Sequence, residues 1–162
     1  MQKLPVGTQS FFILRKNNYL YVDKTKYIYK MIEDGRVYFL SRPRRFGKSL
    51  LISTIEELFK GNKDLFKGLY IYDKWKWNEK YSVIHVDLAG RRVNTPERLE
   101  FTLNKILDEI AEDFEIQLAA DDSYLDRFGE LIKKVYKKTE KEVVILIDEY
   151  DKPITSNLSK KI

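Results

Sequence analysis

The chain has 162 residues, of which 43% are hydrophobic and 34% charged, so it fits one globular domain with a buried core and is not a disordered chain. It contains no cysteine, which excludes disulfides and thiolate metal sites. No apolar run approaches the roughly 20 residues that a membrane-spanning helix needs, and the first residues lack the layout of a secretory signal. We therefore expect a cytoplasmic protein that makes no membrane contact.

The net charge is +5 and the pI about 9.2, which is compatible with binding to nucleic acid. Charge alone is a weak signature, because solvated lysines on an ordinary surface give the same value. Five lysines fall near the end of one expected helix, and they are Lys133, Lys134, Lys137, Lys138 and Lys141. Nucleic-acid binding is therefore kept as an alternative.

In chain order, residues 4–15 are expected to be irregular or strand-like. Asp23 is expected to cap a helix that runs to Asp34 and ends at Gly35. The short apolar run 37–41 has the length of a strand. A loop over 42–47 follows, and then a helix over 48–60 with apolar residues on one face.

The aromatic-rich stretch 62–78 predicts a compact connector with a helical turn. The run 82–88 predicts a second strand. Thr95 is expected to cap the next helix, which runs to Phe114, and Ser123 with Asp126 resembles a capping box for another. A third strand is expected at 143–147.

Strands that alternate with helices predict an α/β fold, with a mostly parallel sheet that helices cover on both faces. We expect residues 1–162 to form the N-terminal part of a single domain with this three-layer fold.

The string SRPRRFGKS lies between the first expected strand and a helix, as in a phosphate-binding loop. Gly47 lets the backbone approach an anion, and the free amides of the following helix favour negative charge. Lys48 can reach the terminal phosphates, and the Ser49 hydroxyl can bind Mg²⁺. The usual first glycine is replaced by Arg42. Arg44 and Arg45 either contact phosphate or face solvent.

The third strand runs directly into Asp148 and Glu149, where ligands bind in open α/β sheets. An aspartate there can hold Mg²⁺ beside the loop serine, and the neighbouring glutamate can deprotonate an attacking water. Acidic residues also end strands at ordinary surfaces, so the pair gains weight from the upstream loop. Ser49 and Asp148 are the predicted metal ligands, Glu149 is the predicted catalytic residue, and the predicted nucleotide-binding residues are Arg44, Arg45, Phe46, Gly47, Lys48, Ser49 and Leu50.

Over nearly its whole length the chain resembles the AAA-ATPase-like proteins of bacteria and archaea. The resemblance is carried by LPVGTQSF, YLYVDKT, YFLSRPRRFGKSLLISTIEELFKG, LFKGLYIYDKWKW, VIHVDL and VILIDEYDKPI. An arginine-rich loop without its first glycine is typical of that family. The resemblance implies a P-loop ATPase fold with an additional strand, with ATP and Mg²⁺ as cofactors.

The same resemblance assigns Lys48 and Ser49 to phosphate and Mg²⁺, Asp148 to Mg²⁺ and Glu149 to catalysis. Many relatives carry a C-terminal nuclease-like domain of the PD-(D/E)xK type. Because the chain ends at Ile162, we expect the sheet to be incomplete on its C-terminal side. Such a sheet leaves unpaired backbone, which favours self-association.

The sequence thus predicts a Mg²⁺-dependent ATP-binding P-loop module with weak hydrolysis at most. One alternative is a remnant of an ATPase that keeps the fold and serves only as an interaction or regulatory module. The other is the nucleic-acid-binding module that the basic charge allows.

Overall fold

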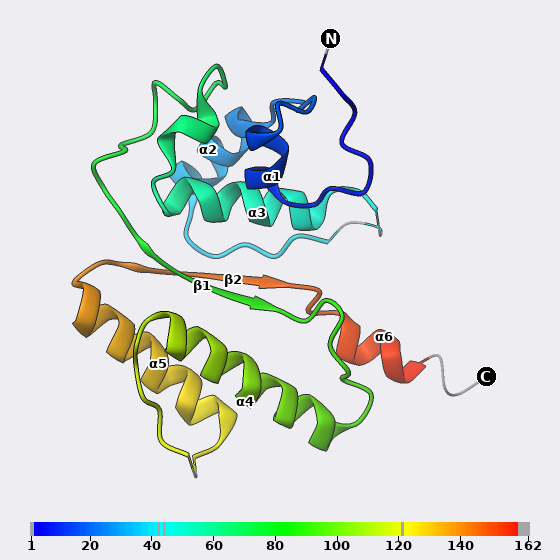
Figure 1. The fold of residues 1–162 in the computed structure, drawn as a ribbon. Helices are drawn as coiled ribbons and strands as arrows, with labels where there is room; N and C mark the ends of the chain where they lie inside the picture. The colour runs from blue at the N-terminus through cyan, green and yellow to red at the C-terminus, as the bar shows by residue number, and fades with distance from the viewer. Residues whose placement is uncertain (1, 42, 44, 121, 159–162) are drawn as a thin grey trace. The chain divides into compact units, whose positions relative to one another are not determined.

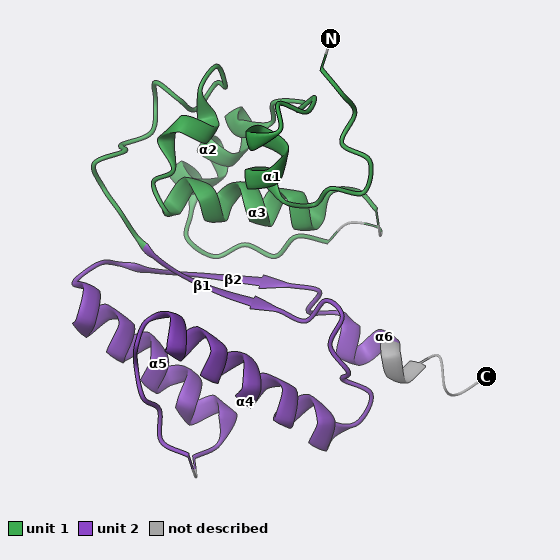
Figure 2. Cartoon of the chain, viewed as in Figure 1, with its two compact units in different colours: residues 1–81 green, residues 82–162 purple. Residues whose placement is uncertain are grey.

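The computed structural model describes residues 2–41, 43, 45–120 and 122–158, with side chains up to residue 155. The chain forms two compact units, Met1–Tyr81 and Ser82–Ile162 (Figure 2), and each is described by itself. In the described part of the chain, no helix combines the length and the apolar character that crossing a bilayer requires.

The first unit is helical (Figure 1). It contains α1 (Phe11–Lys16), α2 (Thr25–Asp34), α3 (Lys48–Phe59) and the 3₁₀ helix η1 (Lys63–Phe66). Its core is built from side chains of all four helices and of the segment after η1, namely Phe11, Leu14, Ile28, Ile55, Leu58, Leu65, Phe66 and Ile71. The predicted helix after the loop and the helical turn in the connector are both confirmed.

Helix α1 corrects the prediction of irregular or strand-like structure over residues 4–15. Ser10 is its N-cap, and the Ser10 hydroxyl accepts a hydrogen bond from the Ile13 N–H. Phe11 and Leu14 are buried on one side of the helix. Six residues are too few for a helical period to stand out in the sequence, so only the capping serine pointed to this helix.

The strand predicted over residues 37–41 is also wrong, because this segment is irregular in the structure. Val37 and Phe39 are 93% and 75% exposed. A strand exists only through hydrogen bonds to a neighbouring strand, and an apolar run cannot show whether that neighbour is in place.

Helix α2 spans the predicted residues and ends at Gly35, but Asp23 is not its N-cap, which is Lys24. Instead, Asp23 and Thr25 attach the start of the helix to the segment after η1. Asp23 Oδ1 accepts the Thr25 N–H at 2.8 Å, and Asp23 Oδ2 accepts the Tyr70 N–H at 2.7 Å. The buried Thr25 hydroxyl accepts the Ile71 N–H at 3.2 Å.

The second unit contains β1 (Ser82–Asp87), α4 (Pro96–Asp113), α5 (Tyr124–Thr139), β2 (Val143–Asp148) and α6 (Lys152–Leu158). The two strands are parallel, as predicted, and their register runs from Ser82 opposite Val143 to Asp87 opposite Asp148. Thr95 and Ser123 cap α4 and α5 through the N–H groups of Arg98 and Asp126, which confirms both predicted caps. Helix α6 was not anticipated.

Helices α4 and α5 cover one face of this sheet (Figure 1). The core between them contains Ile84, Val86 and Leu88 of the β1 segment together with Ile106, Leu107, Ile110, Ala111, Leu131 and Val135. By the register, Ile145 and Ile147 of β2 share the face of Ile84 and Val86. They are nevertheless 39% and 47% exposed, so the two helices cover β1 more completely than β2.

A buried arginine joins α4 to α5. Arg127 is 6% exposed, and its guanidinium donates to Asn104 Oδ1 at 2.7 Å and to an Asp108 carboxylate oxygen. Burying an arginine requires such partners, because an uncompensated charge in the interior is costly. Arg127 is therefore a structural residue.

The described residues form a mixed α/β structure with a parallel two-stranded sheet, in agreement with the predicted class.

Candidate functional site

The predicted phosphate loop leads directly into α3. Gly47 is the N-cap, with a φ of 74°, and a methyl group in place of its hydrogen would meet no atom within 4 Å. The glycine is therefore required by the left-handed backbone and not by lack of space. No described side chain caps α3. Its first turn therefore presents backbone amides and the positive end of the helix dipole to an anion.

The rest of α3 is held firmly in the first unit. The Phe11 N–H donates to Ser53 Oγ at 2.9 Å, and the buried Thr54 hydroxyl donates to the Leu50 carbonyl at 2.7 Å. Ile55 and Leu58 lie in the core. Helix α3 is thus packed into the core along its length and begins with a partly accessible first turn, as an anion-binding helix should.

The predicted binding residues lie together around this turn. Arg45 and Phe46 are exposed, and Lys48, Ser49 and Leu50 are half-buried. Arg45 has a φ of 68°, so a non-glycine residue adopts the left-handed conformation just before Gly47. That conformation costs about 1–2 kcal/mol. Arg42 and Arg44 lie outside the described residues.

The acidic pair lies at the carboxyl end of β2. Asp148 is the last residue of the strand and is 5% exposed, and its Oδ1 accepts the Glu149 N–H at 2.8 Å. Glu149 has a φ of 55°, again left-handed for a non-glycine residue. Strain of about 1–3 kcal/mol persists only where the surroundings impose it, and it is concentrated at functional sites.

The register adds a third carboxylate to this edge. Asp87 ends β1 directly opposite Asp148, and both lie on the face of the sheet away from α4 and α5. Asp87 Oδ1 accepts the Ala89 N–H at 2.7 Å, so the residue also shapes the turn after the strand. The sequence contained a signal, since SVIHVD and VVILID both end an apolar run with aspartate.

The structure thus brings the loop residues together in one unit and the acidic residues together in the other. Lys48 and Ser49 belong to Met1–Tyr81, and Asp148 and Glu149 belong to Ser82–Ile162. The joint action of the two groups on one nucleotide remains a prediction.

The two predicted metal ligands are of the kind that Mg²⁺ prefers. The Ser49 hydroxyl and the Asp148 carboxylate are both hard oxygen donors, although each belongs to a different unit. Among the described residues, no group of three or more His, Cys, Asp or Glu side chains could enclose a metal ion.

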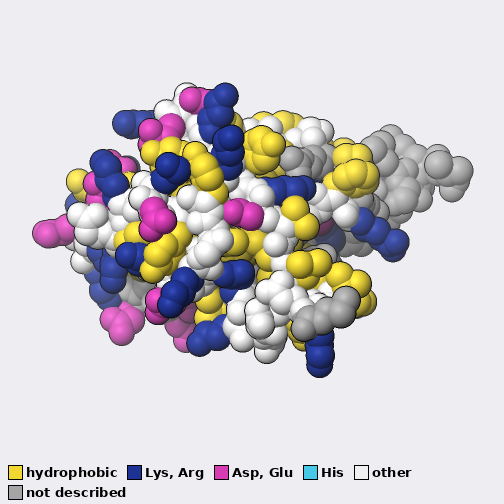
Figure 3. Space-filling model, turned by 90° about the horizontal axis from the view of Figure 1, so that it is seen from above, with side chains coloured by type: hydrophobic (Ala, Val, Ile, Leu, Met, Phe, Trp, Pro, Cys, Tyr) yellow, Lys and Arg dark blue, Asp and Glu magenta, His cyan; other side chains and the backbone are white. Residues whose placement is uncertain are grey.

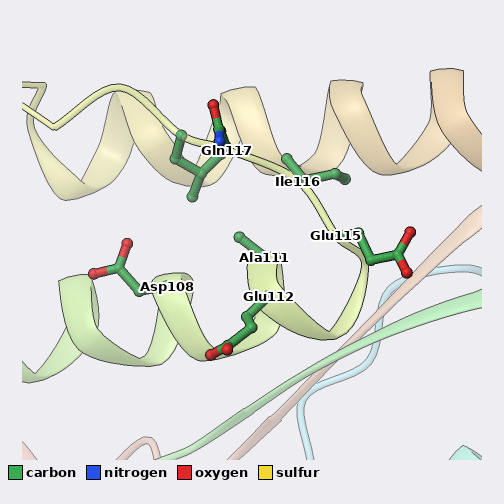
Figure 4. A pocket seen from close by; sticks show the side chains of 7 residues that line it. Asp108, Ala111, Glu112, Glu115, Ile116 and Gln117 are labelled. Atoms are coloured by element: carbon green, nitrogen blue, oxygen red, sulfur yellow. The ribbon is translucent and has the colours of Figure 1, made fainter.

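A pocket of about 610 Å³ lies at the other end of the second unit (Figure 4), and it is lined by Asp108, Ala111, Glu112, Glu115, Ile116, Gln117 and Leu118. Helix α4 returns along the sheet from the end of β1, so its last turns lie away from the carboxyl ends of the strands (Figure 1). The pocket is therefore separate from the acidic pair. At its rim, Lys138 donates to the Glu115 carboxylate at 2.9 Å, and this hydrogen bond lowers the pKa of Glu115.

The lysines of α5 form no uniform basic stripe. Lys134 pairs with Glu130 at 2.7 Å, and Lys138 pairs with Glu115 at 2.9 Å. Figure 3 shows another face of the molecule, on which basic and acidic side chains are mixed with hydrophobic ones. Nucleic-acid binding remains the alternative that the net charge allows.

Comparison with known proteins identifies the family of the chain. A family model described as "Predicted AAA-ATPase" matches residues 5–162. A protein of Azotobacter chroococcum mcd 1, described as "Uncharacterized protein in vnfD 5'region", is 41% identical over 160 residues. The match covers 98% of this chain and 31% of that protein, so the chain spans less than a third of the relative's length. No solved structure matches the chain.

Proposed function

Because the chain belongs to the predicted AAA-ATPase family, we propose that it is an ATP-binding P-loop module that requires Mg²⁺. The observation that carries the proposal is the start of α3, where a left-handed Gly47 is followed by Lys48 and Ser49 on a helix that no described side chain caps. Backbone amides, the helix dipole and the Lys48 amine would together bind a polyphosphate there. The proposal takes ATP as the nucleotide because the family is described as a predicted AAA-ATPase, and no guanine-binding N-K-x-D motif occurs within residues 1–162.

Each residue of the loop has a role in this proposal. The amides from Phe46 to Leu50 line the phosphate chain, and Lys48 neutralises its terminal charge. Arg44 and Arg45 add positive charge beside it. The Ser49 hydroxyl and Asp148 are the protein oxygens that would hold Mg²⁺, which when bound would neutralise charge on the phosphates.

The acidic pair extends the proposal from binding to slow hydrolysis. Glu149 orients the attacking water and accepts its proton, and the γ-phosphate is the group attacked. An arginine finger contributes about 10³ to 10⁵ in rate to related enzymes, and we assign none in this chain. We therefore expect turnover to be slow.

The proposed fold is a three-layer P-loop arrangement. In it, the β1–β2 sheet gains further strands, and helices cover both of its faces. The partly exposed Ile145 and Ile147 support this proposal, because they are apolar side chains that the helices of the second unit leave uncovered.

The test is a titration with ATP in the presence and absence of Mg²⁺. We expect saturable binding that needs Mg²⁺ and that Lys48→Ala abolishes. The control is Lys60→Ala, which removes an exposed lysine just after the same helix, where it pairs with Glu56 at 2.6 Å. Equal binding by the parent and by Lys48→Ala would overturn the proposal.

Hydrolysis is tested separately with Glu149→Gln, which keeps the size of the side chain and removes its basicity. We expect this variant to bind ATP as the parent does and to release phosphate at least about tenfold more slowly. Unchanged phosphate release would remove Glu149 from the mechanism and leave ATP binding standing.

A further inference from the structure

A lysine at the end of the turn between β2 and α6 binds back to the segment that follows β1. Lys152 is the first residue of α6, and its Nζ donates to the carbonyl of Leu88 at 2.9 Å in a partly buried contact. Leu88 directly follows β1 and is 4% exposed. Lys152 thus joins the two segments that leave the carboxyl edge of the sheet.

Backbone hydrogen bonds complete a ring around Glu149. The Leu88 N–H donates to the Asp148 carbonyl at 3.4 Å, and the Leu88 carbonyl accepts from Lys152 Nζ. Between these two contacts the chain passes through Glu149, Tyr150 and Asp151. The Lys152 N–H also donates to the Glu149 carbonyl at 3.0 Å. Leu88 is therefore bonded to the chain on both sides of Glu149.

Glu149 is the enclosed residue with a strained backbone. Glu149 has a φ of 55°, which a non-glycine residue keeps only where its surroundings impose it. Release of Lys152 from Leu88 would open the ring on the α6 side. The Glu149 backbone could then relax toward the extended region, and this would turn its carboxylate in a new direction.

We propose that Lys152 is a positioning residue for ATP hydrolysis, because its bond to the Leu88 carbonyl keeps Glu149 in the orientation that activates water. The inference rests on the proposed function. Lys152 acts through Glu149 and contacts neither nucleotide nor Mg²⁺ in this role. Its loss should therefore lower the rate of the chemical step and leave nucleotide affinity in place.

The experiment compares Lys152→Met, Lys152→Arg and the parent in single-turnover ATP hydrolysis, with the affinity for a fluorescent ATP analogue measured in parallel. We expect Lys152→Met to lower the rate constant by about 10- to 100-fold, the scale of a misplaced catalytic group. Its affinity should stay within about threefold of the parent. Lys152→Arg keeps a long cationic donor, so it should restore most of the rate.

The matched control is Lys134→Met. Lys134 also donates from its Nζ to a backbone carbonyl of the second unit, that of Gln117 at 2.7 Å, but it does so on the exposed side of α5. We expect this variant to hydrolyse ATP at the parental rate. A second readout needs no nucleotide: the amide resonance of Glu149 should shift in Lys152→Met and stay in place in Lys134→Met.

The inference is overturned if Lys152→Met hydrolyses ATP at the parental rate, or if Lys134→Met shows the same loss. A fall in affinity equal to the fall in rate, or a parent that binds ATP without hydrolysing it, would also overturn it. In each of these cases Mg²⁺-dependent binding that Lys48→Ala abolishes would still support the proposed function. A parent that binds no ATP would remove the proposed function itself.

Discussion

At the scale of single residues, position 47 shows how a backbone angle constrains the site. Gly47 has a φ of 74°, and there is room for a larger side chain beside it. Any effect of a substitution there comes from the backbone and not from a steric clash. The direction of the first amides of α3 depends on that angle, so the angle bears directly on anion binding.

We predict that Gly47→Ala lowers the free energy of unfolding by about 1 kcal/mol and weakens Mg²⁺-dependent ATP binding by at least about tenfold. Gly68→Ala is a matched control, because Gly68 lies in the same unit with a φ of 80° and equally open space. It should lose similar stability in urea unfolding and keep its affinity in the ATP titration. Equal affinity losses in both variants would contradict a specific role for Gly47.

At the scale of elements, the segment 21–25 (YVDKT) attaches α2 to the chain after η1. Burial opposes the charged form of Asp23, but hydrogen bonds from Thr25 and from the Tyr70 N–H outweigh it and lower the pKa of Asp23. The folded-state pKa therefore lies below the unfolded one. The stabilisation from this carboxylate is complete above about pH 4 and is lost as the pH falls through the folded value.

We predict that Asp23→Asn lowers the free energy of unfolding by about 1–3 kcal/mol at pH 7, because two N–H donors and a hydroxyl lose a charged acceptor. In urea unfolding, the difference from the parent should shrink as the pH falls from about 5 to 2. Asp73→Asn, which changes an exposed carboxylate in the segment after η1, should show little difference at any pH. A difference that is independent of pH would contradict the role given to the charge.

At the scale of the whole molecule, the proposal requires both units to act on one nucleotide. Lys48 and Ser49 come from the first unit, and Asp148 and Glu149 come from the second. Self-association through an incomplete sheet remains a prediction, and so does the single domain over residues 1–162.

We predict that Mg²⁺–ATP at about 100 times its Kd stabilises the protein by about 2.7 kcal/mol. Amide hydrogen exchange should slow at two places, the first turn of α3 and residues 148–152. Neither change is expected in Lys48→Ala. Protection confined to α3 would mean that nucleotide binds the first unit alone and that Asp148 takes no part.

Features that depend on neighbouring residues could be predicted from the sequence. Thr95 and Ser123 cap their helices as predicted, and α3 begins at Lys48 after Gly47, because a cap or a helix start is set by hydrogen bonds within one turn. The two strands Ser82–Asp87 and Val143–Asp148 were readable from their apolar runs. The family and its candidate residues followed from the same local strings.

The tertiary structure alone decided the features that depend on distant partners. It left residues 37–41 without strand structure, turned Asp23 from an expected cap into a tie to Tyr70, and set Asp87 beside Asp148. It also joined Lys152 to Leu88. Each of these features depends on positions far apart in the chain, and strand pairing and register arise only when those segments meet, so the local sequence at one position does not determine them.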